Sequence, residues 1–103
     1  MVKNHPQVYV DAPLKSRVVR VHVDRGIAGF LQQMWDRGIS TVGSCQEFRP
    51  GLARIWFRYG ADFAEFMRLY PEAESEGALT ADFPKEHLNE PLRQVIPGTV
   101  PAR

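Results

Sequence analysis

The sequence has a single cysteine, a formal net charge of only +1 and no long apolar run. Cys45 has no partner for an intramolecular disulfide, and no paired CxxC cysteines are present, so a disulfide framework and a cysteine-rich zinc centre are excluded. No segment approaches the roughly 20 apolar residues of a membrane span, and residues 1–10 lack the apolar core of a signal peptide. These absences predict a soluble cytoplasmic protein without a membrane partner.

What the chain contains is sufficient for one modest core, because 44% of its 103 residues are hydrophobic and 11% are aromatic. We expect a single domain over residues 1–83 and a proline-rich C-terminal arm over residues 84–103, which hold four of the eight prolines. A chain of this length leaves much of its surface exposed, so self-association into a homodimer would be one route to further stability.

The clearest periodic patterns lie in the first part of the chain. Residues 17–24 alternate between apolar and polar, which predicts a half-buried strand. The following apolar residues recur at helical spacing, with Asp24 as the expected N-cap and Gly38 as the expected left-handed residue at the end of the helix. A short extended piece over residues 7–12 could add an edge strand in front.

A strand hairpin and a second helix are predicted next. Alternation returns over residues 39–45 and again over residues 52–59, and the polar segment 46–51 between them is interpreted as a turn. Helical spacing follows over residues 60–70, and residues 78–84 can supply a fourth strand.

The predicted order is strand, helix, strand, strand, helix, strand. This order favours an α+β, ferredoxin-like split βαβ sandwich, in which an antiparallel sheet carries both helices on one face and has an extra N-terminal edge strand. Because that fold serves enzymes, metal carriers and RNA binders alike, it does not assign a function.

The sheet face that the helices leave open is the first candidate site. Ten of the 13 basic residues are arginine, which suits bidentate contacts to phosphate or carboxylate. Trp56 could stack on a planar ligand between such arginines, or the same face could be a solvated surface or a homo-oligomer interface. The predicted ligand-binding residues, from this face and from the segment 44–49, are Arg20, Ser44, Gln46, Glu47, Arg49, Arg54, Trp56 and Arg58.

Cys45 is the second candidate. Its strand phase predicts a thiol turned toward the helices, as a small apolar residue packed against Phe30 or Met34. A nucleophilic Cys45 would need a histidine base such as His22 or His87. A metal site would have suitable ligand types but no recognisable spacing. Its ligands would come from His22, Cys45, Glu47 and His87.

Residues 24–48 read DRGIAGFLQQMWDRGISTVGSCQEF, and ARIWF follows shortly after. An amphipathic helix, a Gly-Ile-x-Thr-x-x-Ser-Cys-Gln strand and loop, and a strand ending in aromatics together resemble a group of small uncharacterised bacterial and phage proteins. The resemblance covers about a third of the chain. It implies no activity, directs attention to Ser44, Cys45 and Gln46, and departs from the group at Glu47, where glycine is common.

These patterns predict a small non-enzymatic binding domain, encoded by a phage or mobile element, that captures an anionic, nucleotide-like small molecule or a protein partner. No cofactor is expected. The aromatic residues do not follow the RNA-recognition signature, so nucleic acid is not an expected partner. The alternatives are a cysteine-dependent enzyme that uses Cys45 and a structural, homo-oligomeric interaction protein.

Overall fold

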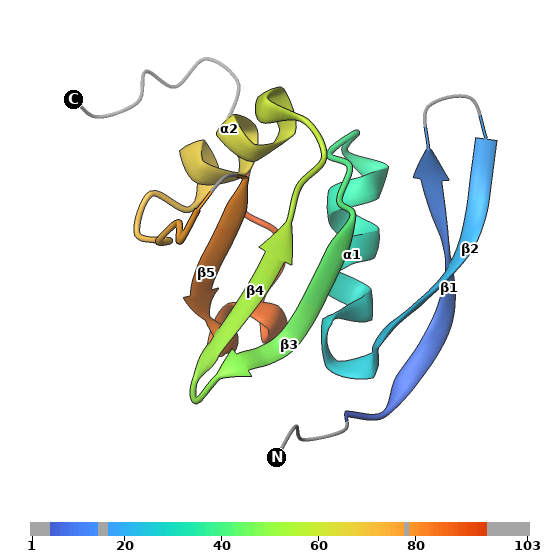
Figure 1. The fold of residues 1–103 in the computed structure, drawn as a ribbon, viewed down its shortest axis with the longest axis horizontal. Helices are drawn as coiled ribbons and strands as arrows, with labels where there is room; N and C mark the ends of the chain where they lie inside the picture. The colour runs from blue at the N-terminus through green and yellow to red at the C-terminus, as the bar shows by residue number, and fades with distance from the viewer. Residues whose placement is uncertain (1–4, 15–16, 78, 95–103) are drawn as a thin grey trace.

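The chain forms two antiparallel sheets and two helices, an α+β arrangement (Figure 1). The computed structural model describes residues 5–14, 17–77 and 79–94. A two-stranded sheet pairs β1 with β2, and a three-stranded sheet has the order β3-β4-β5. The elements are β1 (Gln7–Leu14), β2 (Arg17–Asp24), α1 (Arg25–Asp36), β3 (Gly43–Arg49), β4 (Leu52–Trp56), α2 (Gly60–Leu69), β5 (Thr80–Pro84) and a short 3-10 helix (Lys85–Asn89).

The ferredoxin-like strand arrangement is not confirmed. That arrangement would pair the strand of residues 17–24 with β4 or β5, whereas β2 pairs with β1 along its full length and β4 lies between β3 and β5. The strand expected only as an edge addition, β1, is therefore the hydrogen-bonded partner of β2. Because β1 and β2 follow each other directly in sequence, closing this hairpin costs little chain entropy.

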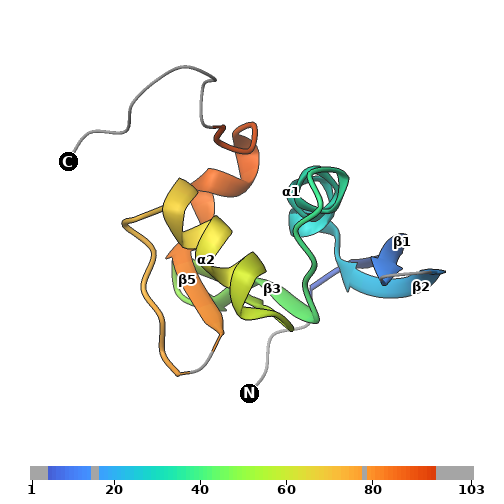
Figure 2. The ribbon, with the colours of Figure 1, turned by 90° about the horizontal axis from the view of Figure 1, so that it is seen from above.

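The core lies between the strands and the two helices, which cover the same side of the three-stranded sheet (Figure 2). Phe83 of β5 contacts Phe30 of α1 and Phe66 of α2, with ring centroids 5.6 and 5.3 Å away. Its neighbours on this strand face, Ala53 and Ile55, are fully buried. The apolar stripe of α1 is buried as its spacing predicted.

The strand after α1 begins later than the sequence pattern predicted. Residues 39–42 form a connection, in which the Ile39 N–H donates to the Met34 carbonyl and the Ser40 N–H to Asp62. The predicted turn over residues 46–51 was too long, because β3 runs through residue 49 and only Pro50 and Gly51 make the turn. The predicted hairpin of β3 with β4 is confirmed. Gly51 has φ of +80°, which suits glycine at such a turn.

The residues after β5 pack against the helices. The Leu92 N–H donates to Gln33 of α1, and the Arg93 N–H donates to the Tyr70 hydroxyl just after α2, at 2.8 and 3.0 Å. Leu92 is buried. The first half of the predicted C-terminal arm therefore contributes to the fold, and residues 95–103 lie outside the described residues. In the described part, no helix has the length and apolar character to cross a membrane.

Candidate functional site

A cleft of about 330 Å³ separates the β1–β2 hairpin from the three-stranded sheet. It lies where β2 and β3 are neighbours but belong to different sheets, and α1 lies over the junction (Figure 2). Apolar side chains of Val21, Leu31 and Trp35 line part of it. The hairpin and the sheet therefore enclose an open space that has an apolar component.

The polar groups of the cleft come from the connection after α1, from β3 and from the segment after β4. Thr41, Ser44 and Arg58 contribute them, and Gln7 and His22 add polar side chains from the hairpin. Trp35 Nε1 donates to Thr41 Oγ1 at 3.1 Å, which leaves the Thr41 hydroxyl proton able to donate to a ligand. Arg58 is exposed, and none of the described residues that line the cleft is acidic. The described lining therefore carries the guanidinium of Arg58 and no carboxylate.

The predicted arginines do not form one platform. Arg58 lines the cleft. Arg54 is only 6% exposed, and its guanidinium donates to both carboxylate oxygens of Asp82 at 2.6 and 2.7 Å and to Glu76 at 2.6 Å. Arg49 also binds Glu76, and Arg20 lies 3.7 Å from Asp11. The carboxylates already occupy the hydrogen-bonding groups that a ligand would need from Arg54.

The other predicted ligand residues are also dispersed. Ser44 lines the cleft, whereas Gln46 accepts a hydrogen bond from the Gly26 N–H at 2.7 Å. Glu47 accepts one from the Gly51 N–H, which satisfies the hairpin turn. Trp56 is half-buried and meets Phe48 edge-on, at a centroid distance of 5.6 Å. The structure thus brings Ser44 and Arg58 together at the cleft and places the other predicted residues elsewhere.

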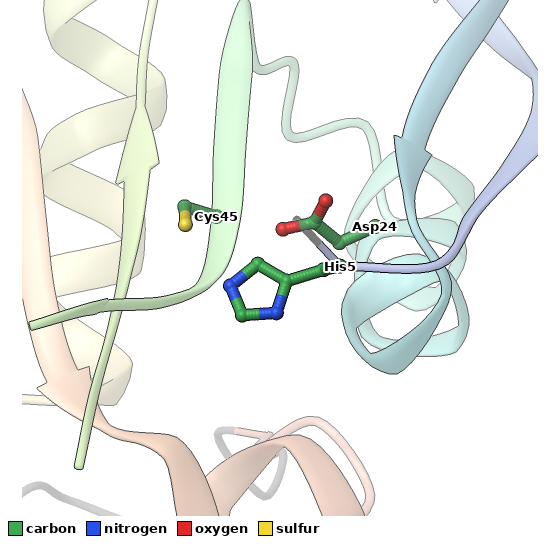
Figure 3. A group of neighbouring side chains, drawn as sticks. All are labelled: His5, Asp24 and Cys45. Atoms are coloured by element: carbon green, nitrogen blue, oxygen red, sulfur yellow. The ribbon is translucent and has the colours of Figure 1, made fainter. Parts of the chain in front are cut away.

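A second group of functional side chains joins the N-terminal segment, β2 and β3 (Figure 3). His5, Asp24 and Cys45 each offer one donor atom, and these three atoms lie within 4.8 Å of one another. Asp24 is the last residue of β2, and Cys45 lies in β3. His5 lies two residues before β1. Because Gln7 pairs with Asp24, His5 lies at the same end of the hairpin as Asp24.

Asp24 holds the group together. The helix begins after it, as predicted, but its side chain makes no capping hydrogen bond. Its carboxylate instead accepts hydrogen bonds from Gln7 Nε2 and from the Gln46 N–H, both at 3.0 Å. Because Gln7 belongs to β1 and Gln46 to β3, one carboxylate connects the two sheets.

The predicted orientation of Cys45 was wrong. Cys45 lies directly opposite Arg54, which is opposite Asp82, so these three share the strand face away from the helices. Its thiol is near Asp24 and not beneath α1 (Figure 3). The alternation from Ile39 failed to predict this because residues 39–42 are not strand.

The surroundings of Cys45 favour the thiol form. Burial raises the pKa of Cys45 most, the Asp24 carboxylate raises it further, and a hydrogen bond with the Glu47 backbone partly offsets both. A thiol with a raised pKa is a poor nucleophile at neutral pH. The nearby histidine is His5, which the sequence analysis did not select, and the register of β1 with β2 is the pattern that could have indicated it.

Comparison of the chain with protein-family models, with curated proteins and with solved structures finds no match. The resemblance over residues 24–57 to small bacterial and phage proteins therefore stays a prediction. The cleft and the group of His5, Asp24 and Cys45 are the two features of the described residues that could bind a ligand.

Proposed function

We propose that the protein is a small non-enzymatic binding domain that captures an anionic small molecule in the cleft between the β1–β2 hairpin and β3. The cleft itself carries the proposal. Its volume of about 330 Å³ lies at the lower end of the range for small-molecule sites. It combines an apolar lining with hydroxyl groups and one exposed arginine, and it lacks an acidic residue among its described lining residues.

The chemistry of the lining defines the ligand class. Val21 and Leu31 suit the apolar faces of a ring. The Arg58 guanidinium can make bidentate hydrogen bonds to a phosphate or carboxylate, and Ser44 can add a hydroxyl. A nucleotide-like molecule, with one ring system and one anionic group, combines these features.

The test is a thermal-shift screen with nucleoside monophosphates, with the matching nucleosides and inorganic phosphate as separate arms. A ligand at a hundred times its Kd should stabilise the fold by about 2.7 kcal/mol. We expect the monophosphates to raise the Tm more than the nucleosides or inorganic phosphate do, because the cleft offers contacts both to a ring and to an anionic group.

Arg58→Ala should weaken binding by about tenfold, since it removes a charge-assisted hydrogen bond. Arg68→Ala is the matched control, because Arg68 is an exposed arginine on α2 that pairs with Glu65. Equal binding by wild type and Arg58→Ala, or no shift with any member of the panel, would contradict the proposal.

A further inference from the structure

The group of His5, Asp24 and Cys45 supports an inference that is independent of the cleft ligand. We propose that these three side chains form a site for a zinc-like divalent metal ion. They would supply an imidazole nitrogen, a carboxylate oxygen and a thiolate sulfur. The fourth position would be left to water or to an exogenous ligand, as in zinc sites with three protein ligands.

The distances between the donors suit this assignment. The three donor atoms lie within 4.8 Å of one another. Zinc bond lengths of about 2.0–2.3 Å place the ligands of a tetrahedral site roughly 3.5 Å apart. The donors therefore need to approach one another by no more than about 1.3 Å, which side-chain rotation can supply without moving a strand.

The burial of Asp24 points to a cation. Asp24 is 5% exposed, and in the described part of the chain no lysine or arginine pairs with its carboxylate. Buried charges in proteins are normally paired with an opposite charge or coordinate a metal. Two neutral N–H donors orient the carboxylate, which is how outer hydrogen bonds hold a metal ligand in place. A metal ion at this position would supply the missing positive charge.

The donor types select the class of metal. Thiolate sulfur and imidazole nitrogen favour zinc and related transition metals, whereas calcium and magnesium prefer oxygen ligands throughout. Binding would replace the Cys45 thiol proton, which passes to the solvent, and one S–metal bond forms in its place.

The imidazole of His5 has one nitrogen available for the metal. Its Nδ1 lies 3.4 Å from Gln46 Nε2, and the other ring nitrogen, Nε2, lies on the side of the ring that faces Cys45 (Figure 3). A metal on Nε2 requires a proton on Nδ1. The Gln46 atom that faces Nδ1 is the amide nitrogen, which only donates, because the amide oxygen is turned to the Gly26 N–H. Gln46 therefore does not accept that proton.

The first experiment titrates the full chain with Co²⁺ and then displaces the cobalt with Zn²⁺. We expect a thiolate-to-cobalt charge-transfer absorption band that disappears on zinc addition. His5→Ala should weaken zinc binding by at least tenfold, and Cys45→Ser should also abolish the charge-transfer band. His22→Ala is the matched control for His5, because His22 is an exposed histidine that stacks on Tyr9.

Wild-type zinc affinity in His5→Ala, or an equal loss in His22→Ala, would overturn the site. So would the absence of any cobalt band in the wild-type protein. Arg58→Ala should keep full metal affinity, so a failure of the cleft proposal and a failure of the metal site are distinguishable.

The second experiment uses Gln46→Glu. One carboxylate oxygen can keep the hydrogen bond from the Gly26 N–H, and the other can accept from His5 Nδ1–H. A carboxylate behind a ligating histidine is typical of zinc sites, and such outer partners change affinity by about 10–100-fold. Zinc binding should therefore tighten by about tenfold or more. Unchanged or weaker binding would overturn the assignment of His5 as a ligand.

Discussion

Arg54 shows how a residue of a predicted binding type can be used for structure. It is buried between the carboxylate of Asp82 and the ring of Phe48, whose centroid lies 3.8 Å from the guanidinium carbon. The hydrogen bonds that Arg54 donates to Asp82, and then to Glu76, raise the pKa of Arg54, so it stays charged throughout the ordinary pH range. Alternation of residues along β4 could indicate the face of Arg54 but not the carboxylates that meet it, because one of them lies in the loop before β5.

Replacement of Arg54 by alanine should cost about 3–5 kcal/mol in the free energy of unfolding, since it leaves a buried carboxylate without its partner. The double change Arg54→Met with Asp82→Leu should cost much less, because no uncompensated charge remains. Chemical denaturation of the two proteins would measure the difference. If the double variant is less stable than Arg54→Ala, the expectation is contradicted. The ion pair would then stabilise the fold by more than the cost of removing its two charges from water.

Cys45→Ser should be tolerated, with a loss of less than about 1 kcal/mol, because the serine hydroxyl can donate to the same Asp24 carboxylate. Thermal unfolding of metal-free protein would measure this. A loss of several kcal/mol would show instead that the thiol is packed as an apolar core residue.

At the scale of elements, Arg93 adds a charge contact to the hydrogen bonds that attach residues 85–94 to the helices. Arg93 binds Glu72 at 2.7 Å, and its guanidinium lies over the Tyr70 ring. The Arg93 guanidinium holds the pKa of Glu72 below its usual range. Because the folded-state pKa is lowered, this contribution to stability is complete above the ordinary Glu pKa of about 4.3 and is lost as pH falls through the lowered value.

Amide exchange would test this pH dependence. Protection of the Leu92 and Arg93 amides, which donate to Gln33 and Tyr70, should fall on acidification while the β4 amides stay protected. Arg93→Ala should show low protection at neutral pH and little further change with acid. A pH profile of Arg93→Ala identical to that of wild type would contradict the assignment to Glu72.

The elements differ in how far their own residues determine them. The two helices were predictable because their apolar stripes repeat within the element. The start of β3 was not, since Ile39 and Thr41 alternate as in a strand but pack against α1, with Thr41 held by Trp35. The register of β1 with β2 could place His5 near Asp24, but the approach of Cys45 to both depends on contacts between β2 and β3, which no local pattern contains.

At the scale of the whole molecule, Asp24 connects the hairpin to the three-stranded sheet. Asp24→Ala would remove the acceptor for the Gln46 N–H and should cost about 1–3 kcal/mol. Hydrogen exchange should then rise in β1 and β2 more than in β4 and β5. Asp24→Asn keeps one carbonyl acceptor and should therefore lose less stability than Asp24→Ala. Uniform loss of protection across both sheets would indicate that the hairpin does not open separately.

The strand pairing also bears on how the chain folds. Each hydrogen-bonded pair, β1 with β2, β3 with β4 and β4 with β5, joins strands that are consecutive in the sequence. A ferredoxin-like sheet would instead place its first strand between its third and last strands, so that strand would gain no partner until β4 had been made. Loop closure becomes more costly as the loop lengthens, and folding rates fall as contacts become less local. Each new strand can therefore pair with the strand made just before it, in the order of synthesis. The β1–β2 hairpin can form before the C-terminal residues have been made.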